Sequence, residues 1–392
     1  MRYFYLLSKF GLFLSLIILV GCKPDEMMTK EEIAIWVETD SQDITTSWTS
    51  MSLTQVAGQD TMLIEGKIKR RGGYSISFPK HSYEIDLLED YSLGCLPSDD
   101  DWILNANCID KTFLRHTVSY QLFRVMDSSH LSAQFVYLSL SVNGVPSGLY
   151  VLMEKLDKSS LEIEDDGVIF KEPHIFRKSY DGVVPQYADN YHQQTFPDIA
   201  DNDLNNSLDS LHAEFISLSD SAFTQLIIST FDLRSLIDWH LLLLISNNND
   251  GVLKNFYLYR QSSRSKYRIA PWDYDHSYGR DGDNELNLIN KEVDIHRSLL
   301  FDRLLDQDWY RDELKSRWSN HTASGVLSLA GLKSKFKRYS DQIDKMREEN
   351  FEVWSLSHSI YQDANTPSQE MDIIYQYLEM RHQSLEEYFE GL

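Results

Sequence analysis

The sequence feature that most constrains the fold is a predicted β-hairpin in the second half of the chain. Two runs rich in aromatic and β-branched residues, Asn255–Arg260 and Lys266–Pro271, flank the polar segment Gln261–Ser265. This pattern predicts two antiparallel strands joined by a turn. Positions equally far from the centre of the turn face each other, so Asn255 should lie opposite Trp272–Asp273.

The open end of this hairpin should gather acidic and amide side chains. Asp250 precedes the first strand, Asn255 begins it and Asp273 follows the second strand. Asp275 points to the same face as Asp273 if the strand continues. Neighbouring carboxylates repel one another, so such a group is stable when a cation such as Mg²⁺ or Ca²⁺ is bound among the oxygens. The alternative is a hairpin whose acidic ends are simply solvated.

The order of these residues is also that of protein kinases, in which an Asp is followed by an Asn five positions later, a hairpin and a second Asp. By this analogy Asp250 takes the proton of the attacking hydroxyl. Asn255 and Asp273 then hold the metal, with Asp275 as a second candidate ligand. The chain departs from the kinase pattern in having Asn248-Asn249 in place of His-Arg and a second Asp in place of the Gly of Asp-Phe-Gly.

A basic, glycine-rich turn is predicted earlier in the chain. Gly72 and Gly73 separate two runs of alternating polar and apolar residues, and they allow the backbone to approach a ligand closely. Arg71, Ser75 and Lys80 flank the glycines and could bind phosphate oxygens through charge-assisted hydrogen bonds. The alternative is a surface hairpin with a basic turn.

Four segments together resemble the CotH kinase family, of the spore-coat protein H type. They are RRGGYSISFPKHSYEIDL (70–87), NGVPSGLYVLMEKLD (143–157), NDGVLKNFYLY (249–259) and APWDYDHSYG (270–279). The resemblance spans roughly residues 60–310. It implies an atypical kinase that uses ATP with Mg²⁺ or Mn²⁺ to phosphorylate a hydroxyl of a protein or another extracytoplasmic acceptor.

The resemblance also implies roles for residues outside the hairpin. The glycine turn would cover the nucleotide, although its spacing differs from that of the standard kinase loop. The residue facing the phosphates is therefore Lys80 or, as second choice, Arg71. Arg115 would belong to the site, or else pack a helix against its neighbours. Glu154, near the expected link between two lobes, would be a site residue or only a charge at the end of a strand.

The chain as a whole predicts an α+β fold with two lobes arranged as in protein kinases. A sheet-rich small lobe covers about residues 31–155, and a mostly helical large lobe begins at about residue 156. The kinase-like domain runs over residues 31–310, and residues 311–392 extend the large lobe with helices. The segment Leu233–Ser246 is apolar nearly all round, which predicts a core helix that leads into the hairpin.

Residues 1–22 predict a bacterial lipoprotein signal peptide. The apolar run Phe10–Val20 is too short for a stable membrane span and leads into a lipobox that ends at Cys22. The alternative is an ordinary signal peptide with a chance cysteine. Residues 23–30 would be a polar tether. We therefore expect an extracytoplasmic protein of the bacterial cell envelope, attached to the membrane through an N-terminal lipid only.

The charge and the cysteines restrict partners further. A net charge of −23 argues against nucleic acid as a partner, because phosphate contacts need Lys and Arg. Cys95 and Cys108 could form one disulfide in an oxidising compartment or remain buried thiols. A second hypothesis for the function is a non-catalytic, surface-exposed binding lipoprotein that uses the same scaffold, with Ca²⁺ in the acidic site, to bind a protein or a glycan.

Overall fold

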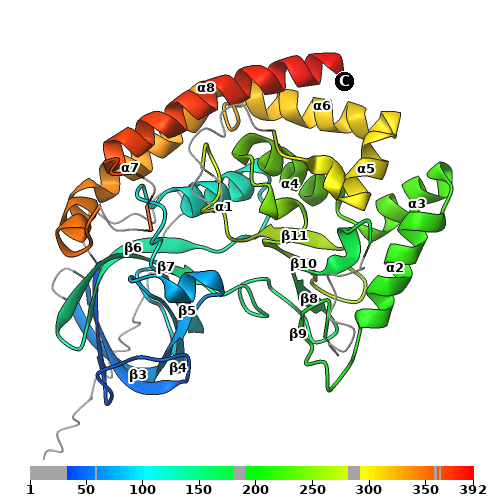
Figure 1. The fold of residues 1–392 in the computed structure, drawn as a ribbon. Coiled ribbons are helices and arrows are strands. Elements are labelled where there is room, and N and C mark those ends of the chain that lie inside the picture. Colours follow the sequence, from blue (N-terminus) through cyan, green and yellow to red (C-terminus); the bar gives the residue numbers. More distant parts are fainter. Residues whose placement is uncertain (1–32, 58–59, 180–189, 281–291, 357–359, 362) are drawn as a thin grey trace, which may run out of the picture.

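The computed structural model describes residues 33–57, 60–179, 190–280, 292–356, 360–361 and 363–392. Within this part of the chain the fold is α+β, as the sequence predicts. Most strands come first and most helices follow (Figure 1). The predicted signal peptide, Cys22 and the tether of residues 23–30 lie outside the described residues.

A closed barrel of seven strands forms the first part of the fold, with the strand order β1-β2-β3-β4-β5-β7-β6. Neighbouring strands are antiparallel except β1 and β6, which pair in parallel and close the ring. Alternate residues of β1 point into the barrel core, beginning with Ile33 and Ile35. The strands are β1 (Ile33–Thr39), β2 (Thr49–Ala57), β3 (Asp60–Arg71), β4 (Ser82–Tyr91), β5 (Asp99–Asn105), β6 (Phe135–Val142) and β7 (Val145–Glu154).

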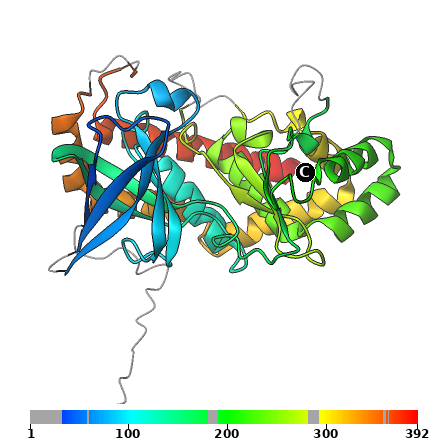
Figure 2. The same cartoon turned by 90° about the horizontal axis from the view of Figure 1, so that it is seen from below.

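A second sheet stands beside the barrel (Figure 2). Its strand order is β11-β10-β8-β9, and its members are β8 (Val168–Lys171), β9 (Gln194–Phe196), β10 (Phe256–Arg260) and β11 (Arg268–Pro271). Strands β10 and β11 form the predicted hairpin, in which Phe256 pairs with Pro271. The Trp272 N–H donates to the Asn255 carbonyl at 3.0 Å. The predicted pairing of Asn255 with Trp272 is therefore confirmed.

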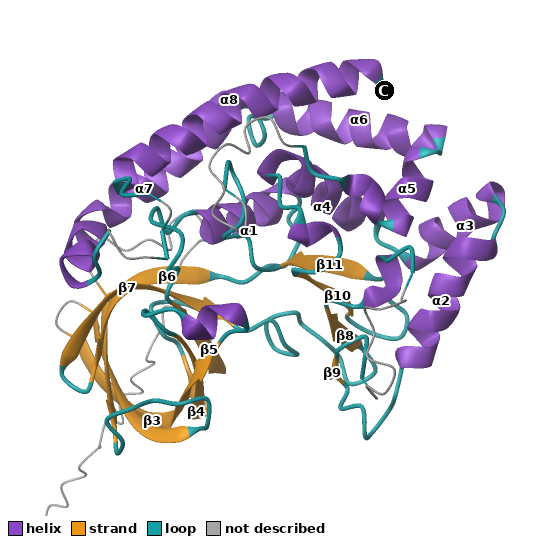
Figure 3. Ribbon diagram, in the orientation of Figure 1, coloured by secondary structure: helices purple, strands orange, loops and turns teal. Residues whose placement is uncertain are grey.

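Most helices lie on one side of the barrel and the second sheet, whereas α2 and α3 lie beside the second sheet (Figure 3). The helix α1 (Arg115–Met126) lies between β5 and β6 in the chain. The remaining helices are α2 (Asn205–Ser217), α3 (Asp220–Thr230), α4 (Leu233–Ser246), α5 (Leu299–Leu305), α6 (Asp308–Ala323), α7 (Leu329–Val353) and α8 (Pro367–Gly391). No helix among the described residues is both long and apolar enough to cross a membrane.

The helix α4 is the buried core helix that the sequence predicts. The Asp232 side chain caps its first turn by accepting the Ser235 N–H at 2.9 Å. Every residue from Ser235 to Ser246 is buried. The helix ends at Asn247, whose φ of 56° is left-handed, a conformation that asparagine tolerates well. The chain turns there and enters the segment that precedes β10.

The helix α8 supports the C-terminal end of α4. The last carbonyls of a helix have no partner within the helix. The Tyr377 hydroxyl donates to the Ile245 carbonyl at 3.0 Å, and Arg381 Nε donates to the Leu244 carbonyl at 2.7 Å. The segment predicted as a C-terminal helical extension therefore contacts the helix that leads into the hairpin.

Candidate functional site

Three side chains that could hold a cation meet at the end of β11. Among the described residues, ligand atoms of His116, Asp273 and Asp275 lie within 4.8 Å of one another. His116 Nε2 is 3.8 Å from Asp273 Oδ1. The Asp273 side chain is 50% exposed, whereas that of Asp275 is 19% exposed and that of His116 is buried. The site is thus half open to solvent on the Asp273 side.

Two asparagines fix the backbone at Asp273. Asp273 has a φ of 56° and Asn255, across the hairpin, has a φ of 60°. Short polar side chains tolerate this left-handed conformation better than bulky ones do. The Asp273 carbonyl accepts hydrogen bonds from Asn255 Nδ2 at 2.9 Å and from Asn248 Nδ2 at 3.3 Å. The segment that follows α4 and the end of the hairpin are therefore joined at Asp273.

Helix α1 holds residues 273–278, which we call the acidic loop, from the other side. The Tyr120 hydroxyl accepts the Asp273 N–H at 3.1 Å, and His116 Nδ1 accepts the Tyr274 N–H at 2.8 Å. Arg115 Nε donates to the Ser277 carbonyl at 3.0 Å. Three residues of one helix thus bind three successive parts of the loop.

Arg115 is a supporting residue in this structure. It is 1% exposed, and its guanidinium bonds Asp110 Oδ1 at 2.5 Å and Glu370 Oε2 at 3.4 Å. The Asp110 carboxylate also accepts the Arg115 N–H at 2.9 Å. Arg280 donates to the same Glu370. Two buried carboxylates and one backbone carbonyl hold the guanidinium of Arg115, and its role in phosphate binding stays a prediction.

Lys80 and Glu154 are held by hydrogen bonds to residues outside the acidic loop. Lys80 is buried, and its ammonium donates to the Leu149 carbonyl and, at 2.9 Å, to Asn350 Oδ1. Burial holds the pKa of Lys80 well below its usual value. Glu154 is buried against Gln134, whose N–H it accepts at 2.8 Å. Packing and internal hydrogen bonds hold both groups in this structure, and their phosphate roles stay predictions.

Arg71 is the predicted basic residue that lies against Trp272, the residue directly before the acidic loop. Its guanidinium carbon lies 5.8 Å from the centre of the Trp272 ring. Ser75 lies close by in the short 3₁₀ helix η1 (Tyr74–Ser77), which follows Gly72. Gly72 has a φ of 128°, and a Cβ there would come within 2.4 Å of the Ser75 hydroxyl. The tight glycine turn predicted from the sequence therefore depends on Gly72.

Asp250 is not part of the three-residue group. It begins the 3₁₀ helix η3 (Asp250–Val252) and forms an ion pair with Lys254 at 2.9 Å. Its side chain is 38% exposed. The N–H of Gly251 donates to Asn248 Oδ1 at 2.9 Å, so η3 is tied to the asparagine that also binds the Asp273 carbonyl.

The electrostatics of the loop suit a bound cation. Partial loss of solvation raises the pKa of the Asp273 carboxyl, and repulsion from Asp275 raises it further. Asp275 Oδ1 is buried and makes no hydrogen bond to any described residue, and His276 Nε2 is 3.6 Å away. A buried carboxylate oxygen without a donor is unfavourable unless a cation or water binds it. The carboxylate oxygens of this loop are ligands that suit a hard divalent cation.

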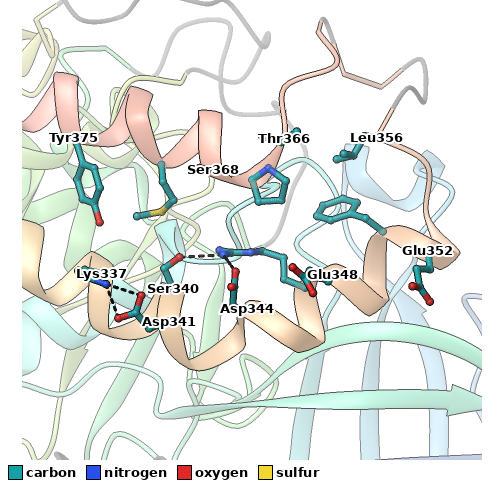
Figure 4. Close-up of a pocket in the computed structure, with 14 residues that line it drawn as sticks. Lys337, Ser340, Asp341, Asp344, Glu348, Glu352, Leu356, Thr366, Ser368 and Tyr375 are labelled. Carbon is teal, nitrogen blue, oxygen red and sulfur yellow. Dashed lines mark hydrogen bonds and ion pairs between the residues drawn. The ribbon is translucent and has the colours of Figure 1, made fainter.

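A separate groove of about 730 Å³ lies between α7 and α8. Figure 4 shows its floor, where Lys337 contacts Asp341, an ion pair of 2.7 Å. Arg347 and Asp344 pair there at 2.8 Å. None of the residues predicted for the site lines this groove, so the acidic loop remains the candidate site.

Sequence reasoning missed His116, Tyr120 and Asn248. His116 and Tyr120 are four residues apart on α1, a spacing that places both side chains on one face of a helix. That spacing was the available signal, but nothing near them in the chain indicates that the acidic loop lies opposite. The two remaining cysteines are not joined by a disulfide in the described part of the chain: Cys95 is exposed and Cys108 is half-buried.

Comparison with known proteins identifies the family of the chain. Inner spore coat protein H of Bacillus subtilis (strain 168) is 22% identical over 289 residues, which cover 70% of this chain and 76% of that protein. A family model described as CotH kinase protein matches residues 68–385. The match includes both sides of the acidic loop and extends through α7 into α8. Because it covers well over half of the sequence, the chain belongs to the CotH kinase protein family.

Proposed function

We propose that this protein is an atypical kinase that transfers phosphate from ATP to a hydroxyl of a protein or another extracytoplasmic acceptor. The barrel and the helical part would act as the two lobes of a kinase-like arrangement, with the nucleotide between them. Membership of the CotH kinase family supports the reaction class. The observation that carries the proposal is the pair Asp273 and Asp275, with one buried carboxylate oxygen lacking a hydrogen-bond donor.

Asp273 and Asp275 are the proposed ligands of Mg²⁺ or Mn²⁺. Asn255 uses its Nδ2 on the Asp273 carbonyl, so its Oδ1 is the atom that remains for the cation. When bound, the metal and ATP supply the polarised γ-phosphoryl group. The guanidinium of Arg71 lies against Trp272 and would neutralise charge on the phosphates, with the Ser75 hydroxyl as a second donor.

Asp250 is the proposed residue that orients the acceptor hydroxyl and takes its proton. Its carboxylate is partly exposed, and Lys254 is its ion-pair partner. Its short 3₁₀ helix is joined through Asn248 to the Asp273 carbonyl. The base is thus positioned by the same backbone contacts that position the metal ligands. No proton transfer in this proposal requires Lys80, Arg115 or Glu154.

The test is transfer of label from γ-labelled ATP, with Mg²⁺ or Mn²⁺, to the protein itself or to candidate acceptors. We expect incorporation in the wild type and a loss of about 100-fold or more in Asp250→Ala, since general base catalysis contributes about 10²–10⁴. Asp250→Ala should still bind nucleotide and metal. Lys254→Gln is the control, because it removes the neighbouring charge and keeps the carboxylate. Unchanged transfer in Asp250→Ala would exclude the proposed base.

The location is also a proposal. The relative in Bacillus subtilis is by its name an inner spore coat protein, and the N-terminal sequence predicts a lipidated Cys22. We infer a surface-exposed, extracytoplasmic protein held by an N-terminal lipid. Metabolic labelling with a radioactive fatty acid should mark the wild type and not Cys22→Ala. Labelling of both proteins would remove Cys22 as the attachment point.

A second candidate is a non-catalytic binding protein, which the name of the relative as a coat component favours. In that case the acidic loop would hold Ca²⁺ and present the scaffold to a protein or a glycan. The same assay decides between the two. No phosphate incorporation with any metal, together with a higher melting temperature in Ca²⁺, would support the binding protein.

A further inference from the structure

We propose that His116 positions the acidic loop and is not a ligand of the cation, so that the protein binds the metal through oxygen atoms only. This inference deepens the proposed function and rests on it for the nature of the bound ion. Geometry alone would group the imidazole with the two carboxylates, since His116 Nε2 lies within 4.8 Å of ligand atoms of Asp273 and Asp275. The hydrogen bond at Nδ1, the other ring nitrogen, gives His116 a different role.

That hydrogen bond fixes the position of the ring proton. His116 Nδ1 accepts the backbone N–H of Tyr274 at 2.8 Å, so Nδ1 carries no hydrogen. In a neutral imidazole the remaining proton is then on Nε2, which makes Nε2 a donor. Nε2 faces Asp273 Oδ1 at 3.8 Å. A nitrogen that carries a proton has no lone pair for a metal ion.

The ring cannot easily adopt the opposite arrangement. His116 is 3% exposed, and its ring centre lies 6.0 Å from that of Tyr120, whose hydroxyl lies 3.5 Å from Nδ1. Turning the ring over would place a C–H group against the Tyr274 N–H. Moving the proton to Nδ1 would place two donors against each other. Either change would leave the buried Tyr274 amide without an acceptor.

His116 therefore has two contacts with the loop that act together. Nδ1 holds the backbone immediately after Asp273, and the Nε2–H group lies beside the Asp273 carboxylate. The second contact favours the ionised carboxylate and leaves its other oxygen for the cation. Tyr120, one turn further along α1, holds the Asp273 N–H. The helix thus sets both the backbone and the side chain of the proposed ligand.

The first test is the tautomer of His116 in the metal-free protein. Long-range ¹H–¹⁵N correlation spectra of protein labelled with ¹⁵N-histidine identify which ring nitrogen carries the proton, and His116→Asn assigns the signal. We expect the proton on Nε2. A proton on Nδ1 would overturn the inference, and this result does not depend on any kinase activity.

The second test uses Mn²⁺ as the probe. Pulsed electron paramagnetic resonance detects a nitrogen bound directly to Mn²⁺, and ¹⁵N-histidine labelling identifies its source. We expect no directly bound histidine nitrogen. A coupling that disappears in His116→Asn would overturn the inference. If the wild type binds no Mn²⁺ at all, the metal-dependent function fails, whereas the tautomer measurement still decides the role of His116.

Substitutions separate the two roles of the ring. His116→Asn places an amide oxygen near the position of Nδ1, so it can still accept the Tyr274 N–H. His116→Leu removes both contacts. We expect the Mn²⁺ affinity of His116→Asn to stay within a few-fold of that of the wild type. The Mn²⁺ affinity of His116→Leu should fall by roughly 10-fold or more, as is typical when support of a metal ligand is lost. If His116→Asn and His116→Leu are both folded and lose the same Mn²⁺ affinity, the positioning role of His116 is contradicted.

Discussion

At the scale of single residues, the acidic loop is held by side chains from two parts of the sequence. Asn248 and Asn255, which are near in sequence, contact the backbone of Asp273. His116 and Tyr120 of α1, which are far away in sequence, contact the loop from the other side. The hairpin brings Asn255 to Trp272 because the turn between them is local. Asp273 then takes a left-handed conformation that Asn255 and Asn248 stabilise through its carbonyl. The loop therefore holds its carboxylates together before any cation is bound.

Asp273→Asn should remove metal-dependent nucleotide binding without destabilising the fold. Two unit charges 4 Å apart interact by about 4 kcal/mol at an effective dielectric constant near 20, so the affinity for Mn²⁺ should fall by roughly 100-fold or more. Partial loss of solvation and repulsion from Asp275 raise the pKa of Asp273, so its ionised form is unfavourable in the metal-free fold. The metal-free variant should consequently melt at or above the wild-type temperature.

Calorimetric titration with Mn²⁺ and with Mg·ATP measures the first effect, and thermal melting measures the second. Asp344→Asn, on α7, is the matched control, because that side chain is 65% exposed and lies away from the loop. Unchanged titration curves in Asp273→Asn would remove Asp273 from the proposed metal site.

Residue placement could be predicted where it follows from local structure. The register of Asn255 against Trp272 came from the turn alone, and the tight turn at Gly72 came from its two glycines. Lys80 could not be placed, because its ammonium is positioned by Asn350, which is 270 residues later. His116 was missed for the same reason: its partner Tyr274 is 158 residues away. Such contacts depend on tertiary packing, which the pattern near each residue does not contain.

At the scale of elements, α8 stabilises the base of the site through one buried carboxylate. Glu370 accepts Arg280 Nε at 2.9 Å, and it accepts Arg115 at 3.4 Å and Asn365 at 3.1 Å. Arg115 in turn holds the Ser277 carbonyl of the acidic loop. A helix near the C-terminus thus contributes to the position of the loop without touching the proposed ligands.

Glu370→Gln should lower the free energy of unfolding by about 3–5 kcal/mol, because it leaves two buried guanidinium groups short of negative charge. Chemical denaturation measures the change. Glu379→Gln is the matched control on the same helix: its side chain is 58% exposed and pairs with Lys333, so the expected loss is below about 1 kcal/mol. A similar decrease in the free energy of unfolding in both variants would show that the buried Glu370 network stabilises the fold no more than an exposed ion pair does.

At the scale of the whole molecule, the core contains a histidine that should make stability depend on pH. His240 on α4 is fully buried, its ring centre lies 4.3 Å from that of Phe301, and its Nδ1 is 3.0 Å from the Tyr310 hydroxyl. Burial lowers the pKa of His240 from 6.5 to about 3. The folded protein therefore excludes a proton that the unfolded chain accepts.

The expected consequence is a loss of stability in mild acid. Between pH 6.5 and about 3 the unfolded state binds one more proton at this position, so the free energy of unfolding falls as the pH falls. His240→Phe keeps a ring in the core and cannot be protonated. Over that window its stability should depend on pH less steeply than that of the wild type, by up to about 1.4 kcal/mol per pH unit.

Denaturation curves at a series of pH values measure this slope. His382→Phe serves as the control, since that histidine lies on α8 beside Glu386 and its side chain is 14% exposed. Identical slopes for the wild type and His240→Phe would show that the core histidine is not the source of the acid sensitivity. His240 lies within Leu233–Ser246, the apolar run that the sequence predicts as a core helix.

The contacts of α8 determine when the site can form during synthesis. Tyr377 and Arg381 bind the end of α4, and Glu370 supports Arg115 and Arg280. Glu370, Tyr377 and Arg381 are translated about 90 to 100 residues after the acidic loop, which therefore leaves the ribosome well before α8 can support it. A nascent chain that stops short of this last helix should lack the proposed cation site. Removal of the helix by a protease should likewise abolish the proposed cation binding without any cut near the aspartates.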